Sequence, residues 1–358
     1  MPTISIRGNE MPASPIRKLA PLADAAKQRG VHVFHLNIGQ PDLPTPQVAI
    51  DAIRNIDRKV LEYSPSAGYR SYREKLVGYY AKFNINLTAD DIIITSGGSE
   101  AVLFSFLSCL NPGDEIIVPE PAYANYMAFA ISAGAKIRTI ATTIEEGFSL
   151  PKVEKFEELI NERTKAILIC NPNNPTSSAI STADMKKLLT VCRSLGIFVM
   201  IDETYIEFAP EGTSLSAVSL VPEFDNFMVI RGVSKFFAAP GLRFGYGLTS
   251  NQAFLQTLLT HQNPWSLNSI GAYAGERMLK DTDYIQKTWS LIDSERTRMC
   301  TELSGLDTVK IYPAYANFVL VKILKEGLTS FDVFEKAIHQ NLMIRDCSSF
   351  ESLNGEYV

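Results

Sequence analysis

The segment Val233-Ser-Lys-Phe-Phe-Ala-Ala-Pro-Gly-Leu-Arg-Phe-Gly-Tyr246 places one lysine among small and apolar residues, with an arginine eight positions later. Burial against apolar side chains would lower the pKa of Lys235 and free its lone pair to attack an aldehyde. The planar guanidinium of Arg243 offers a fork of donors that suits a phosphate dianion. Taken alone, both residues fit solvated surface charges equally well, because most lysines and arginines are exposed.

A glycine turn, Ser96-Gly-Gly-Ser-Glu100, follows the apolar run Asp91-Ile-Ile-Ile-Thr95 and precedes an apolar stretch with helical character. A buried strand, a glycine turn and a helix N-terminus form an anion site, because the first N–H groups of a helix have no acceptor within it and glycine lets the backbone approach closely. Ser99 adds a hydroxyl there. The alternative is a plain strand-to-helix turn with Ser99 as the N-cap.

Two further segments end strand-like runs with polar side chains. Asn171-Pro-Asn-Asn-Pro-Thr176 follows Ala166-Ile-Leu-Ile-Cys170, and amides there can donate to a phenolate oxygen. Phe198-Val-Met-Ile-Asp-Glu-Thr-Tyr205 ends with a carboxylate and, three positions on, a phenol. Asp202 can pair with a protonated pyridine nitrogen. A helix cap at Asp202 and an Asx-turn at Asn174 remain alternatives.

Together, the four segments supply what pyridoxal 5'-phosphate needs from a protein: an amine for its aldehyde, a phosphate cradle, a donor to the ring oxygen and an anion at the ring nitrogen. In this combination and order, the chain resembles the class I/II aminotransferases, the fold type I group of pyridoxal-phosphate enzymes. The resemblance extends from Asn37-Ile-Gly-Gln-Pro-Asp42 to Ile344-Arg-Asp-Cys-Ser-Ser349.

The resemblance implies a role for each matched residue. Lys235 would hold the cofactor as a Schiff base and Asp202 would pair with the pyridinium. The other implied contacts are to the ring oxygen from Tyr205 and Asn174, to the phosphate from Gly98, Ser99, Ser234 and Arg243, and to the ring face from Tyr123. Family members extend a tyrosine at the position of Tyr63 to the phosphate of the neighbouring subunit, which implies a homodimer with composite sites. Gly39, Arg345 and Arg17 match positions near the substrate.

The implied activity is transfer of an amino group from an L-amino acid, with aspartate or aromatic donors favoured, to a 2-oxo acid such as 2-oxoglutarate. Lys235, displaced by the donor, would move the α-proton, and a second oxo acid would complete a ping-pong cycle. Two enzymatic alternatives are a histidinol-phosphate aminotransferase and a decarboxylase of the threonine-phosphate type. The non-enzyme alternative is a binding or regulatory protein that keeps the cofactor fold without turnover.

The pattern of residues 45–245 predicts a large cofactor-binding α/β domain. Amphipathic helical stretches alternate there with short Val/Ile runs bounded by Gly, Pro or Asn. This alternation indicates a three-layer α/β/α arrangement with a mainly parallel central sheet. Residues 1–44 and 246–358 are expected to form a smaller α+β domain, with a strand over Ala316-Asn-Phe-Val-Leu-Val-Lys322 and a helix over about 330–340.

Composition excludes several function classes. The 358 residues, 46% hydrophobic and 20% charged, can bury a sizeable core, and the net charge of −5 provides no basic footprint for nucleic acid. No apolar run approaches the ~18 residues of a membrane span, and no basic-then-apolar leader is present. The five cysteines lack C-x-x-C spacing and no histidine pair has metal-ligand spacing, so we expect a cytoplasmic protein with reduced thiols and no bound metal.

Three positions depart from the family pattern. Ser177 replaces a usual glycine, and a serine at positive φ would cost roughly 1 kcal/mol. Gly232 replaces a hydroxyl residue that binds phosphate. The sequence ends at Gly355-Glu-Tyr-Val358, where family members usually continue to an arginine that binds the substrate carboxylate. The expectation is therefore a truncated chain or another basic residue in that role.

The two halves of the chain resemble different branches of the family. Up to about residue 176, segments such as Tyr63-Ser-Pro-Ser-Ala-Gly-Tyr69 are similar to aspartate and aromatic aminotransferases. After it, segments such as Phe237-Ala-Ala-Pro-Gly-Leu-Arg243 are similar to histidinol-phosphate aminotransferases and threonine-phosphate decarboxylases. A natural mosaic or a constructed chimera joined near Ser177 is one interpretation, and the amino donor stays open.

Overall fold

The computed structural model describes residues 3–12, 20–210 and 215–358. A seven-stranded sheet forms its centre, in the order β2 (Ile92–Thr95), β8 (Gly245–Leu248), β7 (Phe227–Gly232), β6 (Phe198–Asp202), β5 (Thr164–Cys170), β3 (Glu115–Glu120) and β4 (Lys136–Ala141). β8 is antiparallel to both its neighbours, and the other pairs are parallel. The predicted mainly parallel sheet is confirmed.

Helices cover both faces of this sheet. One face packs against α5 (Gly98–Cys109), α6 (Asn125–Ala133) and α10 (Gln252–His261). The other packs against α3 (Gln47–Arg54), α4 (Arg70–Ala81), α7 (Val153–Leu159), α8 (Thr182–Ser194) and α11 (Ser269–Met278). Within β5, Ile167 and Ile169 join the second cluster and Leu168 joins the first. Because both faces are buried, the strands read as continuous apolar runs.

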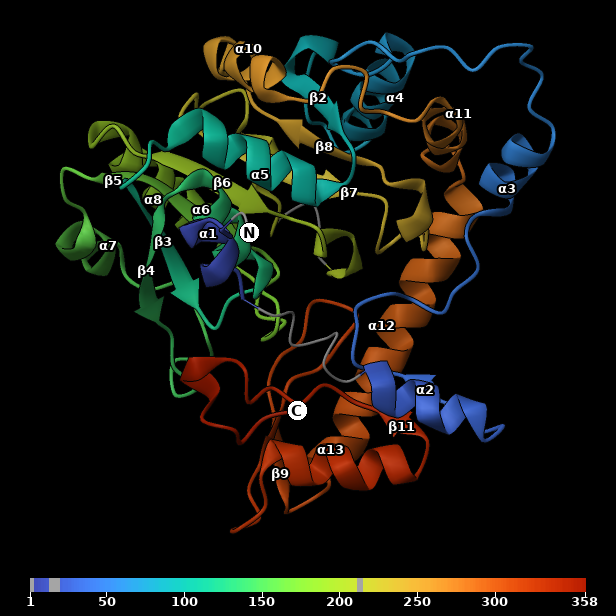
Figure 1. Cartoon of the computed structure of the whole chain (residues 1–358), viewed down its shortest axis with the longest axis vertical. Coiled ribbons are helices and arrows are strands. Elements are labelled where there is room, and N and C mark those ends of the chain that lie inside the picture. The colour runs from blue at the N-terminus through green and yellow to red at the C-terminus, as the bar shows by residue number, and fades with distance from the viewer. Residues whose placement is uncertain (1–2, 13–19, 211–214) are drawn as a thin grey trace.

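A second lobe is built from both ends of the chain. It contains α2 (Ala20–Gln28), α13 (Ser330–His339), a parallel pair of β1 (Phe34–His35) and β11 (Leu342–Met343), and an antiparallel pair of β9 (Val309–Ile311) and β10 (Val321–Ile323). The long helix α12 (Thr282–Ser304) runs from the main body into this lobe (Figure 1). Ala23 and Val33 share a buried cluster with Phe334 and Met343, which joins the two chain ends.

Shorter elements complete the described part of the chain. α1 (Ile6–Glu10) lies beside α6, where Arg7 donates to the carbonyl oxygen of Ser132 at 3.2 Å. The 3₁₀ helices are η2 (Ala89–Asp91), η3 (Ile206–Phe208), η4 (Ala217–Leu220), η5 (Pro240–Leu242) and η6 (Glu351–Leu353). Among the described residues, no helix is both long and apolar enough to cross a membrane.

Element predictions outside the central sheet are confirmed in part. The helix expected over 330–340 is α13, but the strand expected from Ala316 to Lys322 is wrong in extent, because β10 begins only at Val321. The N–H of Ala316 donates to Ser177 Oγ at 2.8 Å and its carbonyl accepts from Arg296 at 3.1 Å. Its backbone groups therefore bond to side chains rather than to a neighbouring strand.

The proposed division of the chain at residue 245 stays a prediction. β8 extends to Leu248, α10 packs against α5, and α11 packs against α3 and α4. These contacts place 245–278 with the main body and favour a later boundary.

Candidate active site

The carboxyl ends of the parallel strands bring the predicted cofactor residues together. Asp202 is the last residue of β6, Asn174 follows β5, and Lys235 follows β7. Because β8 is antiparallel to β7, Arg243, which precedes β8, lies at the same edge. Gly98 begins α5 directly after β2. Open α/β sheets bind ligands at this edge, where the loops from adjacent strands converge.

The carboxyl group of Asp202 is buried and held by three donors. With 8% of the residue exposed, its Oδ2 accepts from the Tyr126 hydroxyl at 2.7 Å. Its Oδ1 accepts from the N–H of Thr204 at 3.0 Å and from Thr204 Oγ1 at 2.5 Å. The nearest following helix, η3, has Tyr205 as its N-cap, so Asp202 caps no helix there.

Sequence analysis does not identify Tyr126 or Thr204. Tyr126 lies at the start of α6, three positions after Tyr123, and the two rings meet edge to face at 5.4 Å. Only that spacing, which puts both phenols on one side of a helical turn, could have indicated a shared site. The contact of Tyr126 with Asp202 depends on how α6 packs on the sheet.

Lys235 is a half-buried amine next to charges of both signs. Its Nζ lies 5.5 Å from the centroid of the Tyr205 ring. Burial lowers the pKa of Lys235 below its ordinary value of 10.5, Asp202 opposes that shift, and the Arg243 guanidinium adds to it. A lysine with a lowered pKa is a better nucleophile and base at neutral pH.

Tyr205 and Asn174 meet across the site. Asn174 Nδ2 donates to the Tyr205 hydroxyl at 3.5 Å. Burial raises the pKa of the Tyr205 phenol, so it stays a neutral hydroxyl. The Asx-type turn belongs to Asn173, whose Oδ1 accepts from the N–H of Thr176 at 3.2 Å. A Cβ built on Gly39 would lie 2.5 Å from the Tyr205 hydroxyl, so the N-terminal segment reaches the site at a position without room for a side chain.

The turn before α5 forms a cradle with Arg243. Gly97 has φ +85° and is the N-cap of α5, and a Cβ on it would collide with Arg243 Nη2. Arg243 itself has φ +52° and donates to the carbonyl oxygens of Pro240 at 3.1 Å and Ser96 at 3.4 Å. Ser99 lies exposed in the first turn of the helix and is not its N-cap.

Gly232 is explained by crowding. A Cβ on Gly232 would lie 3.1 Å from the carbonyl oxygen of Phe244, which is tighter than ordinary contact. A side chain there would require the Phe244 peptide, just before β8, to move by a few tenths of an ångström. Ser234, two positions on, is half-buried.

Ser177 adopts the positive φ expected of the glycine it replaces. Its φ is +61° and the residue is fully buried. Its hydroxyl accepts from the backbone N–H groups of Tyr315 at 3.0 Å and Ala316 at 2.8 Å. These bonds offset part of the conformational cost and join the Asn174 loop to the segment before β10.

The predicted peripheral residues are distributed around the edge. Tyr123 accepts from Asn125 Nδ2 at 2.6 Å. Tyr63 is 79% exposed and lies 4.9 Å, centroid to centroid, from the Trp265 ring, which is itself 57% exposed. The proposed role of Tyr63 in a neighbouring subunit stays a prediction.

Arg345 lies in the second lobe, after β11. Its Nη2 donates to Ser349 Oγ at 3.1 Å, and its buried Nη1 has no hydrogen-bond partner among the described residues. Burial lowers the pKa of its guanidinium. Arg17, the other predicted substrate residue, lies outside the described residues.

A buried ionic cluster lies next to the site residues in sequence. Arg231 donates through Nε and Nη2 to Glu203 at 3.0 and 2.7 Å, through Nη1 to Glu207 at 3.1 Å, and through Nη2 to Ser216 at 2.6 Å. Glu203 also accepts from the N–H of Ala217 at 2.6 Å. Burial raises the pKa of Glu207, whose Oε2 has no partner in the described part of the chain. The cluster ties the loop after β6 to the end of β7.

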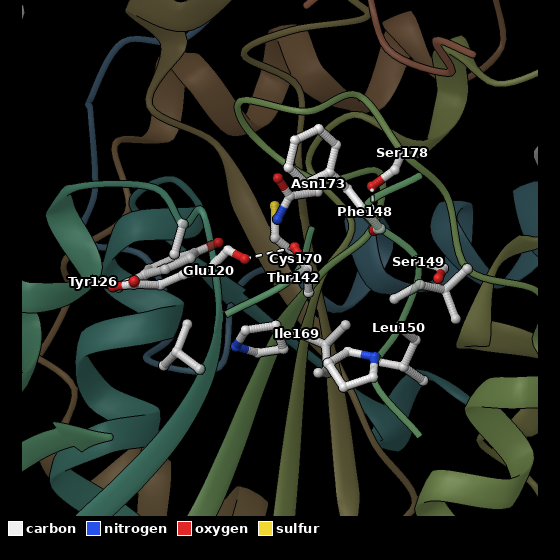
Figure 2. Close-up of a pocket in the computed structure, with 15 residues that line it drawn as sticks. Glu120, Tyr126, Thr142, Phe148, Ser149, Leu150, Ile169, Cys170, Asn173 and Ser178 are labelled. Carbon is white, nitrogen blue, oxygen red and sulfur yellow. Dashed lines mark hydrogen bonds between the residues drawn. The ribbon is translucent and has the colours of Figure 1, made fainter. Parts of the chain in front are cut away.

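A small cavity borders the site at the ends of β3 and β5 (Figure 2). Tyr126, Cys170 and Asn173 line it, and its volume is about 20 Å³. That is room for roughly one water and far below the ~300 Å³ of a small-molecule site. The cavity by itself is therefore too small to hold a cofactor.

Lys235 lies on the turn after an interior strand, and the buried Asp202 ends the adjacent parallel strand. This arrangement is typical of the fold type I pyridoxal-phosphate enzymes. The family described as aminotransferase class I and II matches residues 31–356, and the chain belongs to that family. It is a pyridoxal-phosphate-dependent aminotransferase by family.

Individual relatives agree on the fold and differ in activity. A histidinol-phosphate aminotransferase of Methanopyrus kandleri is 30% identical over 322 residues, covering 88% of this chain and 80% of the relative. A threonine-phosphate decarboxylase of Salmonella typhimurium is 28% identical over 324 residues, covering 90% and 84%. An aspartate aminotransferase of Thermus thermophilus, a single mutant, superposes with a TM-score of 0.88 at 25% identity, covering 98% and 93%. The first alignment is long enough to include both sides of Ser177, so both halves of the chain resemble one relative.

The edge of the sheet fits pyridoxal phosphate. Gly97 leaves open the space where a side chain would displace Arg243, and the first N–H groups of α5 lack acceptors within the helix. Asp202, fixed by its three donors, offers an anion for a ring nitrogen, and the Lys235 amine is available for an aldehyde.

Proposed function

We propose that Lys235 binds the cofactor and moves the substrate proton in a ping-pong transamination. The observation that carries this proposal is the lowered pKa of a half-buried amine beside Asp202, Arg243 and the Tyr205 ring. An unprotonated amine in that position can both attack an aldehyde and accept an α-proton.

The other residues hold groups in place. Pyridoxal phosphate, when bound, supplies an aldehyde for the amino group and a ring that withdraws electrons from the α-carbon. Asp202, oriented by Tyr126 and Thr204, faces the ring nitrogen, and Tyr205 with Asn174 holds the ring oxygen. The remaining contacts are to the phosphate, from Gly98, Ser99, Ser234 and Arg243, and to the ring face, from Tyr123.

The donor carries an anionic group that meets Arg345. The buried Nη1 of Arg345, which has no partner among the described residues, supports this assignment, since a donor left unpaired in a buried place is costly. Gly39 and Arg17 are proposed as further substrate contacts. An L-amino acid of the aspartate or aromatic type is the first candidate, with 2-oxoglutarate as acceptor.

A second candidate activity rests on the relatives. A histidinol-phosphate aminotransferase and a threonine-phosphate decarboxylase are 30% and 28% identical to this chain over similar lengths. The substrates in the names of both relatives carry a phosphate, and a phosphate would also suit the guanidinium of Arg345.

The test is a donor panel read by the visible absorbance of bound pyridoxal phosphate. L-Aspartate, L-glutamate, an aromatic amino acid, histidinol phosphate and phosphothreonine are added in turn to the loaded enzyme and to Lys235→Ala. We expect one donor to convert the cofactor to its aminated form, with 2-oxoglutarate restoring it, and no conversion in the variant. Release of CO₂ from phosphothreonine without an oxo acid would instead establish decarboxylation. Conversion by Lys235→Ala at the native rate would overturn the role of the lysine.

We also propose a homodimer in which Tyr63 of one subunit reaches the phosphate site of the other. Tyr63 and Trp265 form an exposed aromatic pair, and Val60 and Leu61 nearby are 65% and 57% exposed. Exposed apolar clusters of this kind mark contact surfaces. Sedimentation should give a dimer. Tyr63→Phe should weaken cofactor binding but leave the dimer intact. A monomer that binds cofactor at full affinity would refute the composite site.

A further inference from the structure

The Asn174 loop and the second lobe are joined at Ser177. The residue has φ +61°, a conformation that side chains disfavour, and it is fully buried. Strained residues persist only where the surrounding structure holds them, and they concentrate at functional sites. At this position the family pattern has glycine, which would adopt the same φ without strain, so the serine side chain is not needed for the turn itself.

The hydroxyl of Ser177 is the acceptor for two consecutive amides. Tyr315 donates to Ser177 Oγ at 3.0 Å and also to the Ser177 carbonyl oxygen at 2.9 Å. Ala316, which is fully buried, donates to Ser177 Oγ at 2.8 Å. No other acceptor for the Ala316 amide occurs among the described residues. The two amides therefore differ: only that of Tyr315 keeps an acceptor if the hydroxyl is lost.

Arg296 holds the same segment from the other side. Its Nη1 donates to the carbonyl oxygens of Ala316 at 3.1 Å and Phe208 at 2.8 Å, and Nη2 pairs with Asp293 at 2.7 Å. Phe208 ends η3, the turn that directly follows Tyr205. The peptide units around Ala316 are thus fixed between the loop of Asn174 and the loop of Tyr205.

The pinned segment reaches the active site. Phe318 meets the Tyr205 ring edge to face at 5.0 Å, and Asn317 Oδ1 is buried without a partner within the described ranges. A shift of residues 315–318 would therefore move a ring that packs on Tyr205 and an amide oxygen free for a ligand.

We propose that Ser177 is a positioning residue: with Arg296 it fixes residues 315–318 against the cofactor loops, so that Asn317 and Phe318 form one wall of the substrate site. This inference rests on the proposed function for the identity of that site. The link itself is a property of the folded chain and holds with or without a donor.

The test uses hydrogen exchange of the full chain, with and without pyridoxal phosphate, in Ser177→Gly and Ser177→Ala. The glycine variant relieves the strain and loses the acceptor, while the alanine variant keeps the strain and loses the acceptor. We expect both to accelerate exchange of the Ala316 amide by at least about tenfold and that of Tyr315 by less, because an unsatisfied buried amide is costly. Arg296→Lys should loosen the same segment from the opposite side.

The matched control is Ser178→Ala. This hydroxyl lies in the same loop but donates to the Phe148 carbonyl oxygen at 3.1 Å (Figure 2) and pairs with Thr176 Oγ1, and it makes no hydrogen bond to residues 315–318 within the described ranges. It should leave Ala316 exchange as in the native chain. Native exchange in Ser177→Gly, or equal acceleration in the control, would overturn the proposal.

Kinetics separate positioning from a purely structural role. With the donor found in the panel, Ser177→Gly should raise KM about tenfold and change kcat less than about twofold, since a wall of the substrate site contributes mainly uniform binding. An unchanged KM would overturn the assignment to the substrate site. If no donor reacts, the exchange result still decides whether the link exists, so failure of the proposed function and failure of this inference are distinguishable.

Discussion

Replacing Arg231 by methionine tests the buried ionic cluster. Methionine keeps an unbranched apolar stem but is shorter than arginine, and it removes all four hydrogen bonds that the guanidinium makes to Glu203, Glu207 and Ser216. Glu203 retains donors from Ser216 and the backbone of Ala217. Glu207 loses its ion pair with Arg231 while it stays buried.

We expect Arg231→Met to lower the free energy of unfolding by about 3–5 kcal/mol, because removing one partner of a buried ion pair leaves the other charge buried and unpaired. An unfolding entropy of about 2.1 cal/mol/K per residue gives about 750 cal/mol/K for the 358 residues. The melting temperature should therefore fall by about 4–7 °C if the chain unfolds as one unit.

The loss should also depend on pH. Burial already raises the pKa of Glu207, and removing the neighbouring cation raises it further. A carboxyl with a raised folded pKa favours the folded state below its ordinary pKa of 4.5, and this contribution is lost as pH rises through the folded value. The deficit of Arg231→Met should therefore grow with pH above that point.

Calorimetry of the apo protein measures both effects, with Arg298→Met as the matched control. Arg298 on α12 also pairs with two carboxylates, those of Glu295 and Glu302, but on the exposed surface. Solvent screens such pairs, so the control should melt at the native temperature. Equal melting shifts in the two variants would refute the reasoning from burial.

Three further outcomes are expected. Gly97→Ala should lower cofactor affinity more than tenfold because its Cβ would displace the Arg243 guanidinium. The control Gly113→Ala, at φ +92° with nothing within 4 Å of the added Cβ, should lose about 1 kcal/mol of stability but keep the native cofactor affinity. Equal affinities of the two variants in a fluorescence titration would contradict this. Tyr126→Phe removes a bond to a buried carboxyl group and should cost about 1.5–3 kcal/mol of unfolding free energy if that group is ionised, measured in urea at neutral pH. Lys235→Met should stabilise the apo protein at neutral pH, because a lysine whose pKa is lowered by folding binds fewer protons in the folded chain than in the unfolded one. This gain in stability should shrink as pH rises toward 10.5. A difference in melting temperature that does not change with pH would exclude the lowered pKa.

Much of the site could be predicted because of where its residues lie in the local pattern. Asp202, Asn174 and Gly98 each follow an apolar run that is a strand, and the carboxyl ends of parallel strands meet at one edge whatever the strand order. The apolar run from Ala316 was wrongly predicted to begin a strand there, because its backbone groups form hydrogen bonds with the side chains of Ser177 and Arg296 instead of a neighbouring strand.

The sequence by itself determined the class of fold, the cofactor and the residues that end each strand, because these depend on local spacing and on residue chemistry. Only the tertiary structure decided which distant groups meet: Tyr126 with Asp202, 76 positions apart, and Ser177 with Ala316, 139 positions apart. It also decided how crowded Gly232 is, since a Cβ there would meet the Phe244 carbonyl oxygen just before β8 at 3.1 Å. Such contacts arise from strand order, helix packing and side-chain direction, which no local pattern specifies.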